Sequence, residues 1–64
     1  MNDADVLLTV PQAARMTALK EATIRRRILE RRIGYVKLGR SVRIPLQEVE
    51  KLIRRGYRPP IGNE

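Results

Sequence analysis

Residues 9–32 read TVPQAARMTALKEATIRRRILERR, and this stretch decides the fold. Thr9 is followed three positions later by Gln12, which is the spacing of a capping box at the start of a helix. Pro11 falls in the first turn, where a missing N–H is harmless. Small or apolar residues then recur at helical spacing, at Val10, Ala13, Ala14 and Thr17. We therefore predict a short helix over residues 10–17.

A second helix is predicted over residues 21–32, after a brief turn. Ile24 and Ile28 form its one clear apolar stripe, so the helix docks along a narrow face and exposes most of its circumference. Gly34 follows, either as a late cap or as the start of the next strand. Two short helices joined by a turn of about three residues, the second rich in arginine, are typical of a helix-turn-helix.

A β-hairpin is predicted next, because residues 35–38 and 42–44 alternate apolar and polar side chains. We expect its apolar face to hold Val36, Leu38, Val42 and Ile44. Lys37 and Arg43 then lie on the outer face, with Arg40 at the tip. Pro45 is expected to end strand pairing and to open a third helix. The apolar positions of that helix are Leu46, Val49, Leu52 and Ile53.

The predicted fold class is mainly α with a β-hairpin, a winged helix-turn-helix with a two-stranded wing and a C-terminal helix. The expected divisions are a polar lead over residues 1–7, the domain over 8–55 and a flexible tail over 56–64. Arg54 and Arg55 are expected near the C-terminal end of the third helix, where positive charge interacts favourably with the helix dipole, and Gly56 fits a left-handed cap. At 64 residues the chain forms one small domain with modest stability.

The charge balance points to a polyanionic partner, because 14 Lys and Arg residues face 7 acidic ones, for a net charge of +7. The alternative is a soluble basic domain without such a partner. The chain has no His and no Cys, so we expect no metal site, no cofactor and no enzyme activity. No signal peptide or apolar run of ~20 residues is present, which predicts a cytoplasmic protein.

The second helix carries the candidate DNA-reading residues. The residues on or beside the surface opposite its apolar stripe are Lys20, Glu21, Ala22, Arg25 and Arg26. An arginine fork matches the O6 and N7 acceptors of guanine, and Glu21 is able to accept from a cytosine amine. Arg25, Arg26 and Arg27 repel one another without a counter-ion, which invites an anionic ligand. The alternative is a solvated basic face on a structural helix.

Further arginines are candidates for the DNA backbone and the minor groove. Arg27, Arg32 and Arg43 are placed for phosphate contacts. The tip Gly39-Arg40-Ser41 has the form of a wing that puts Arg40 in a minor groove and Ser41 on a phosphate, with Lys37 on the same wing. A charged turn is also an ordinary solubility device. Leu29 lies away from the apolar stripe, either alone in solvent or in contact with a neighbouring protein.

Leu8 to Ile53 resembles the excisionase-type family of small DNA-binding domains, which is related to the winged helix of MerR-like regulators. The residues that carry the resemblance are Leu8-Thr9-Val10 with Ala13-Ala14, Thr23-Ile24 with Ile28, Val36-Lys37-Leu38-Gly39-Arg40, and Arg43-Ile44-Pro45. Lys20 departs from the usual Ser or Thr cap, Ala18 from the usual turn glycine, and Arg31 from the glycine that ends the second helix. The departure at Arg31 predicts either an extension to Arg32 or a left-handed residue.

The resemblance implies that residues 20–26, Thr23 included, read the major groove and that residues 39–41 form a minor-groove wing. It also implies an architectural protein that bends attachment-site DNA and helps an integrase to excise. Because so small a domain covers only a few base pairs, we expect several copies side by side on the DNA or a partner such as the integrase. A small transcriptional regulator of a phage or mobile element is the alternative within DNA binding. Outside it, the alternative is a basic protein-interaction module.

Overall fold

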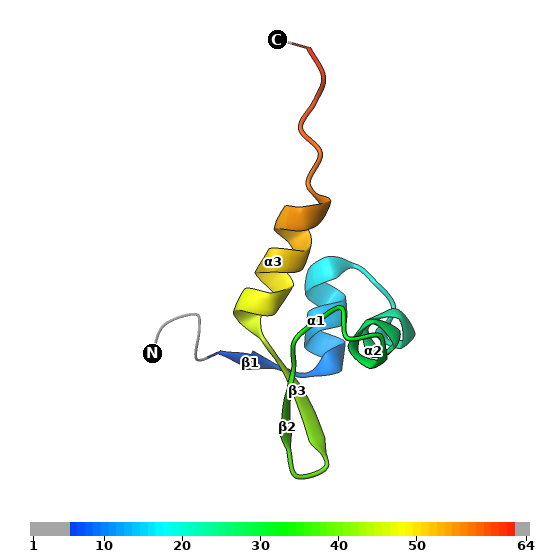
Figure 1. Ribbon diagram of the computed structural model, residues 1–64, viewed down its shortest axis with the longest axis vertical. Helices are drawn as coiled ribbons and strands as arrows, with labels where there is room; N and C mark the ends of the chain where they lie inside the picture. Colours follow the sequence, from blue (N-terminus) through cyan, green and yellow to red (C-terminus); the bar gives the residue numbers. More distant parts are fainter. Residues whose placement is uncertain (1–5, 63–64) are drawn as a thin grey trace.

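In the computed structural model, residues 6–62 form three helices and a three-stranded antiparallel sheet (Figure 1). The elements are β1 (Leu7–Leu8), α1 (Val10–Thr17), α2 (Glu21–Leu29), β2 (Val36–Leu38), β3 (Ser41–Pro45) and α3 (Leu46–Gly56). The structure describes this range; residues 1–5 of the predicted lead and 63–64 of the predicted tail lie outside it. The predicted winged helix-turn-helix is confirmed, with a third strand added to its sheet.

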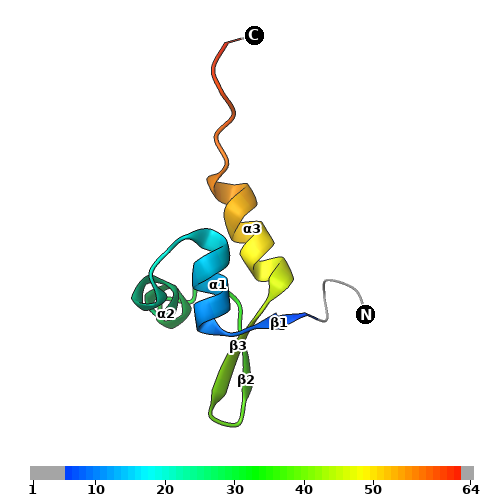
Figure 2. The ribbon, with the colours of Figure 1, turned by 180° about the vertical axis from the view of Figure 1, so that it is seen from behind.

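Helix α1 begins and runs as its sequence predicts. The Thr9 N–H donates to Gln12 Oε1 at 2.9 Å, and the Gln12 N–H donates to Thr9 Oγ1 at 3.2 Å, which completes the capping box. Val10, Ala13 and Ala14 are buried. Small side chains on this face let neighbouring helices approach, and α1 lies between α2 and α3 in both views (Figures 1 and 2).

Helix α2 ends at Leu29, so the predicted extension to Arg32 is wrong. Arg31 adopts a left-handed conformation with φ 60°, and the Arg32 N–H turns back to the Arg27 carbonyl at 2.8 Å. One left-handed residue is enough to end a helix, even when it is not glycine. Gly34 is neither a cap nor part of a strand, because α2 is capped at Glu30 and β2 begins at Val36. Its N–H instead donates to Glu48 Oε1 at 3.0 Å.

Strand β1 was not predicted, and it joins the sheet at the edge of β3. Leu7 lies opposite Pro45 and Leu8 opposite Ile44, so Leu7 belongs to the sheet rather than to the polar lead. The expectation that Pro45 ends strand pairing is also wrong. Pro45 has no N–H, but the next amide, that of Leu46, donates to the Val6 carbonyl at 2.9 Å and continues the pairing.

The wing, formed by β2 and β3, does not have the single apolar face that was predicted. Its register pairs Val36 with Arg43, Lys37 with Val42 and Leu38 with Ser41, and directly opposite residues share a face. Val42 and Ile44 therefore lie on the same face as Lys37. The cause is the two-residue turn at Gly39 and Arg40, where a φ of 62° at Gly39 alone fits a type II′ turn.

The core lies where α1 meets α2, α3 and the sheet. Its buried residues are Val10, Ala13, Ala14, Ile24, Ile33, Ile44 and Val49. Ile53 of α3 is 49% exposed, so it lies outside this core.

Gly56 is the last residue of α3 and does not have a positive φ, so the predicted left-handed cap is wrong. Residues 57–62 are exposed and form no helix or strand. Within the described range, no helix is long and apolar enough to cross a membrane.

Candidate nucleic-acid interface

The side chains of three consecutive arginines, residues 25–27, project from α2 in three directions. Successive residues of a helix are turned by about 100°, so Arg25 and Arg27 project from opposite flanks and Arg26 lies between them. Ile24 is buried in the core, whereas Arg25 and Arg26 are exposed and Arg27 is half-buried. Figure 1 shows α2 nearly end-on beside α1, with the wing extending away from the end of the molecule that carries α3.

The flank of α2 that carries Arg25 borders a shallow groove of about 340 Å³ that also touches α1 and the wing. We call it the cationic groove. Its lining residues are Thr9, Val10, Pro11, Arg25, Arg40, Ser41, Val42 and Arg43. It thus combines the start of α1, one side of α2 and the wing tip. No acidic side chain lines it among the residues that the structure describes.

The charges near this groove are only loosely paired. Arg25 Nη1 lies 3.5 Å from Glu21 Oε1 in an exposed pair, so the prediction of three arginines without a counter-ion is wrong for Arg25. An exposed pair of this kind contributes little and is readily exchanged for a phosphate. Arg43 Nη1 donates to the Val42 carbonyl at 2.9 Å, which holds its guanidinium beside the wing. The groove is therefore basic and open.

The opposite flank of α2 faces α3. Arg27 and Arg32 line a second cleft of about 490 Å³ together with Arg55 near the end of α3. Within the described part of the chain, Arg27 Nε is buried without a hydrogen-bond partner, and Arg32 makes an exposed 3.5 Å pair with Glu30. Of the three residues predicted to contact phosphates, the structure thus places Arg43 in the cationic groove and the other two elsewhere.

Comparison with protein families places residues 7–57 in a model described as a helix-turn-helix domain. The chain belongs to this helix-turn-helix family. A helix-turn-helix domain supports binding to double-stranded DNA. The second helix of this motif is called the recognition helix because it enters the major groove in known complexes, and α2 has that position in this chain. The comparisons with curated proteins and with solved structures found no significant match.

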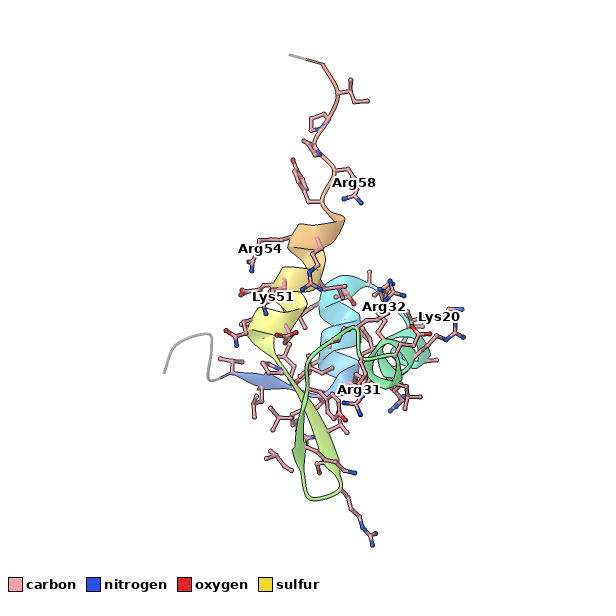
Figure 3. The ribbon with its side chains drawn as sticks, viewed as in Figure 1. Lys20, Arg31, Arg32, Lys51, Arg54 and Arg58 are labelled. Carbon is pink, nitrogen blue, oxygen red and sulfur yellow. The ribbon has the colours of Figure 1, made fainter. Side chains whose placement is uncertain are left out.

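The other predicted contacts of the helix-turn-helix lie around the recognition helix and the wing. Lys20, Ala22 and Arg26 are exposed, and Thr23 is half-buried. Lys20 is the N-cap of α2 but makes no side-chain capping bond. In Figure 3 its side chain extends outward from α2, on the side of the molecule away from Arg54. Lys37 and Gly39 belong to the wing but do not line the cationic groove.

Sequence reasoning missed the contribution of α1 to this surface. Thr9, Val10 and Pro11 line the groove at the start of α1, which is the end where the helix dipole is positive. The capping box at Thr9 was the available signal, since it marks that end of the helix. Val42 was missed because it was assigned to an apolar hairpin face turned toward the core.

The segment between the recognition helix and the wing is attached to α3. Glu48 accepts hydrogen bonds from the Gly34 N–H at 3.0 Å and from Lys51 Nζ at 3.2 Å. The Gly34 hydrogen bond, followed by that of Lys51, lowers the pKa of Glu48. A Cβ at position 34 would lie 2.9 Å from Glu48 Cδ, so glycine permits this approach. The contact helps to set the wing relative to α2.

Proposed function

We propose that the chain is an excisionase-like architectural protein that assembles on attachment-site DNA, bends it and promotes excision by an integrase. The observation that carries this proposal is the cationic groove, which joins the recognition helix to the wing. A helix in the major groove and a wing in the adjacent minor groove grip a duplex at two points. Such a grip favours bent DNA over straight DNA when the two points do not lie along a straight duplex.

The wing supports a bending role. Leu38 is 54% exposed and lies beside the Gly39-Arg40 turn. Proteins that bend DNA through its minor groove combine arginine or lysine with an apolar side chain that partly unstacks a base step. Arg40 and Leu38 provide that combination at the wing tip. The resemblance to excisionase-type domains in Leu8 to Ile53 supports attachment-site DNA as the target.

The small size of the domain supports assembly with partners. One copy covers only a few base pairs, so specificity requires several copies side by side or contact with the integrase. We propose that the protein acts by binding alone, in the cytoplasm, without catalysis and without a cofactor.

The binding step is tested by titrating a duplex from an attachment region at two salt concentrations. We expect affinity to fall steeply with salt, because phosphate contacts release counter-ions. The double variant Arg25→Ala, Arg26→Ala should lose about 100-fold in affinity, from two contacts worth about 1–3 kcal/mol each. Arg54→Ala is the matched control, since Arg54 extends from α3 away from α2 (Figure 3). A flat salt response, or an intact double variant, contradicts the DNA-binding surface.

The excision role is tested by recombination of an attachment-site substrate by the element's integrase, with and without the protein. We expect the protein to raise excision and to bend the substrate in a fluorescence-transfer assay. Binding and repression of a promoter without any effect on excision would instead identify a transcriptional regulator. Loss of a protein partner in the double variant, with DNA affinity intact, would identify a protein-interaction module.

A further inference from the structure

A second groove, of about 250 Å³, lies between α2 and β3, and its surface is almost entirely apolar. Its lining residues are Val10, Arg25, Ile28, Leu29 and Val42. Leu29 is 82% exposed, which is unusual for a leucine on an otherwise basic helix. This apolar groove shares Val10, Arg25 and Val42 with the cationic groove, so the two form one continuous surface.

The position of the surface determines what crosses it when the protein holds DNA. The following step rests on the proposed grip, with α2 in the major groove and the wing in the minor groove. One sugar–phosphate strand separates those two grooves of a duplex. That strand must pass between α2 and the wing, over the cationic and apolar grooves. Ser41 and Arg43 on the cationic side match its phosphates, whereas the hydrocarbon on the other side does not.

We propose that the apolar groove packs against a deoxyribose of this crossing strand and selects DNA over RNA at that position. The C2′ carbon of deoxyribose is a methylene group, which hydrocarbon side chains accept at no cost. The 2′-hydroxyl of a ribose would be buried against Leu29, Ile28 and Val42, none of which offers a hydrogen-bond partner. Arg25, the one polar residue of the lining, is paired with Glu21.

The size of the penalty follows from the loss of hydration of one hydroxyl. Burying a polar group without a partner costs about 1–3 kcal/mol, and a cost of about 1.4 kcal/mol within that range is a tenfold loss of affinity. The effect is local to the crossing nucleotides. It is therefore distinct from the rejection of double-stranded RNA as a whole, whose narrow major groove already excludes a helix.

The experiment places a single ribonucleotide at each position of each strand in a duplex selected for binding to the full chain. We expect a short window of neighbouring positions on one strand at which the 2′-hydroxyl weakens binding by about tenfold. In Leu29→Ala the penalty should shrink to about twofold. Ile53→Ala removes a half-exposed side chain of α3 and is the matched control, which should keep the window.

Two further substitutions separate desolvation of the hydroxyl from other causes. A 2′-fluoro nucleotide shifts the sugar pucker as ribose does but carries no hydroxyl, so we expect it to restore most of the lost affinity. Replacing thymine by uracil should leave the effect of Leu29→Ala unchanged. If the loss in Leu29→Ala instead depends on the thymine methyl group, the groove faces base edges and the inference is wrong.

The inference and the proposed function fail in different ways. Tight binding to duplex DNA without a window of 2′-hydroxyl sensitivity overturns the deoxyribose contact alone. A window that persists unchanged in Leu29→Ala does the same, because the apolar groove then does not cause it. Absence of binding to any duplex overturns the DNA-binding grip itself and the inference with it.

Discussion

Helices α1 and α2 are adjacent and of similar length, yet they differ in what holds them. Helix α1 is closed by the Thr9–Gln12 capping box and buries Val10, Ala13 and Ala14. Helix α2 has no side-chain cap and buries only Ile24. Helix α1 is therefore held by its own cap and by three buried side chains, whereas α2 has one buried side chain and no side-chain cap. This arrangement leaves most of the surface of α2 free for DNA.

The largest effect is expected when that one buried side chain is shortened. Ile24 is 1% exposed, so Ile24→Ala should lower the free energy of unfolding by about 3 kcal/mol, through lost burial and the cavity left behind. Chemical denaturation measures it. Ile53→Ala, at a half-exposed position, should cost clearly less. Equal costs for the two variants would show that α2 is held by contacts other than Ile24.

The features of α1 were predictable from sequence because they are local. A capping box spans four residues, and the helical spacing of Val10, Ala13 and Ala14 needs no knowledge of other elements. The same locality explains why the helix-turn-helix and the basic face of α2 were found. It also explains why the start of α1 was not recognised as part of the cationic groove, since its neighbours Arg25 and Arg43 come from other elements.

The features that escaped prediction depend on one residue or on partners far along the chain. The end of α2 depends on Arg31: its departure from glycine left open either an extension to Arg32 or a left-handed residue, and the left-handed conformation is the one found. Strand β1 is two residues long and exists only through its pairing with β3. Which side chains share a face of the wing depends on whether the turn has an even or an odd number of residues. The two-residue turn pairs Val42 with Lys37, whereas an odd number of turn residues would have put the apolar side chains of both strands on one face.

The next effect concerns the two N-caps. Thr9→Ala removes the side-chain acceptor of the capping box and should lower the free energy of unfolding by about 1 kcal/mol. Lys20→Ser should raise it by about 0.5–1 kcal/mol, because a serine side chain accepts an N–H that is now left without a cap. Thermal denaturation of both variants checks this. A lower free energy of unfolding in Thr9→Ala and a higher one in Lys20→Ser would support the difference between a capped α1 and an uncapped α2. A lower value in both variants would contradict it.

A smaller effect is expected where α2 ends. Arg31→Gly relieves a left-handed conformation that costs a non-glycine residue roughly 1–2 kcal/mol, less the added backbone freedom of glycine when unfolded. We expect a net gain of about 0.5 kcal/mol in the free energy of unfolding. Glu30→Gly, at a φ of −82°, is the control and should destabilise the protein. Destabilisation by both variants would mean that the Arg31 side chain makes a contribution larger than its strain.

The smallest effect on stability is expected at Glu48, which accepts a hydrogen bond from the Gly34 N–H in the segment that follows α2. The pKa of its carboxyl is lowered in the folded protein, so the charged form is favoured by folding. This contribution is present above the unfolded pKa and is lost as pH falls through the lower, folded pKa. In Glu48→Gln the amide oxygen still accepts the N–H but does not titrate. The wild-type protein should therefore lose more stability than Glu48→Gln between neutral and acidic pH, and parallel pH profiles would show that Glu48 does not anchor the segment beyond α2.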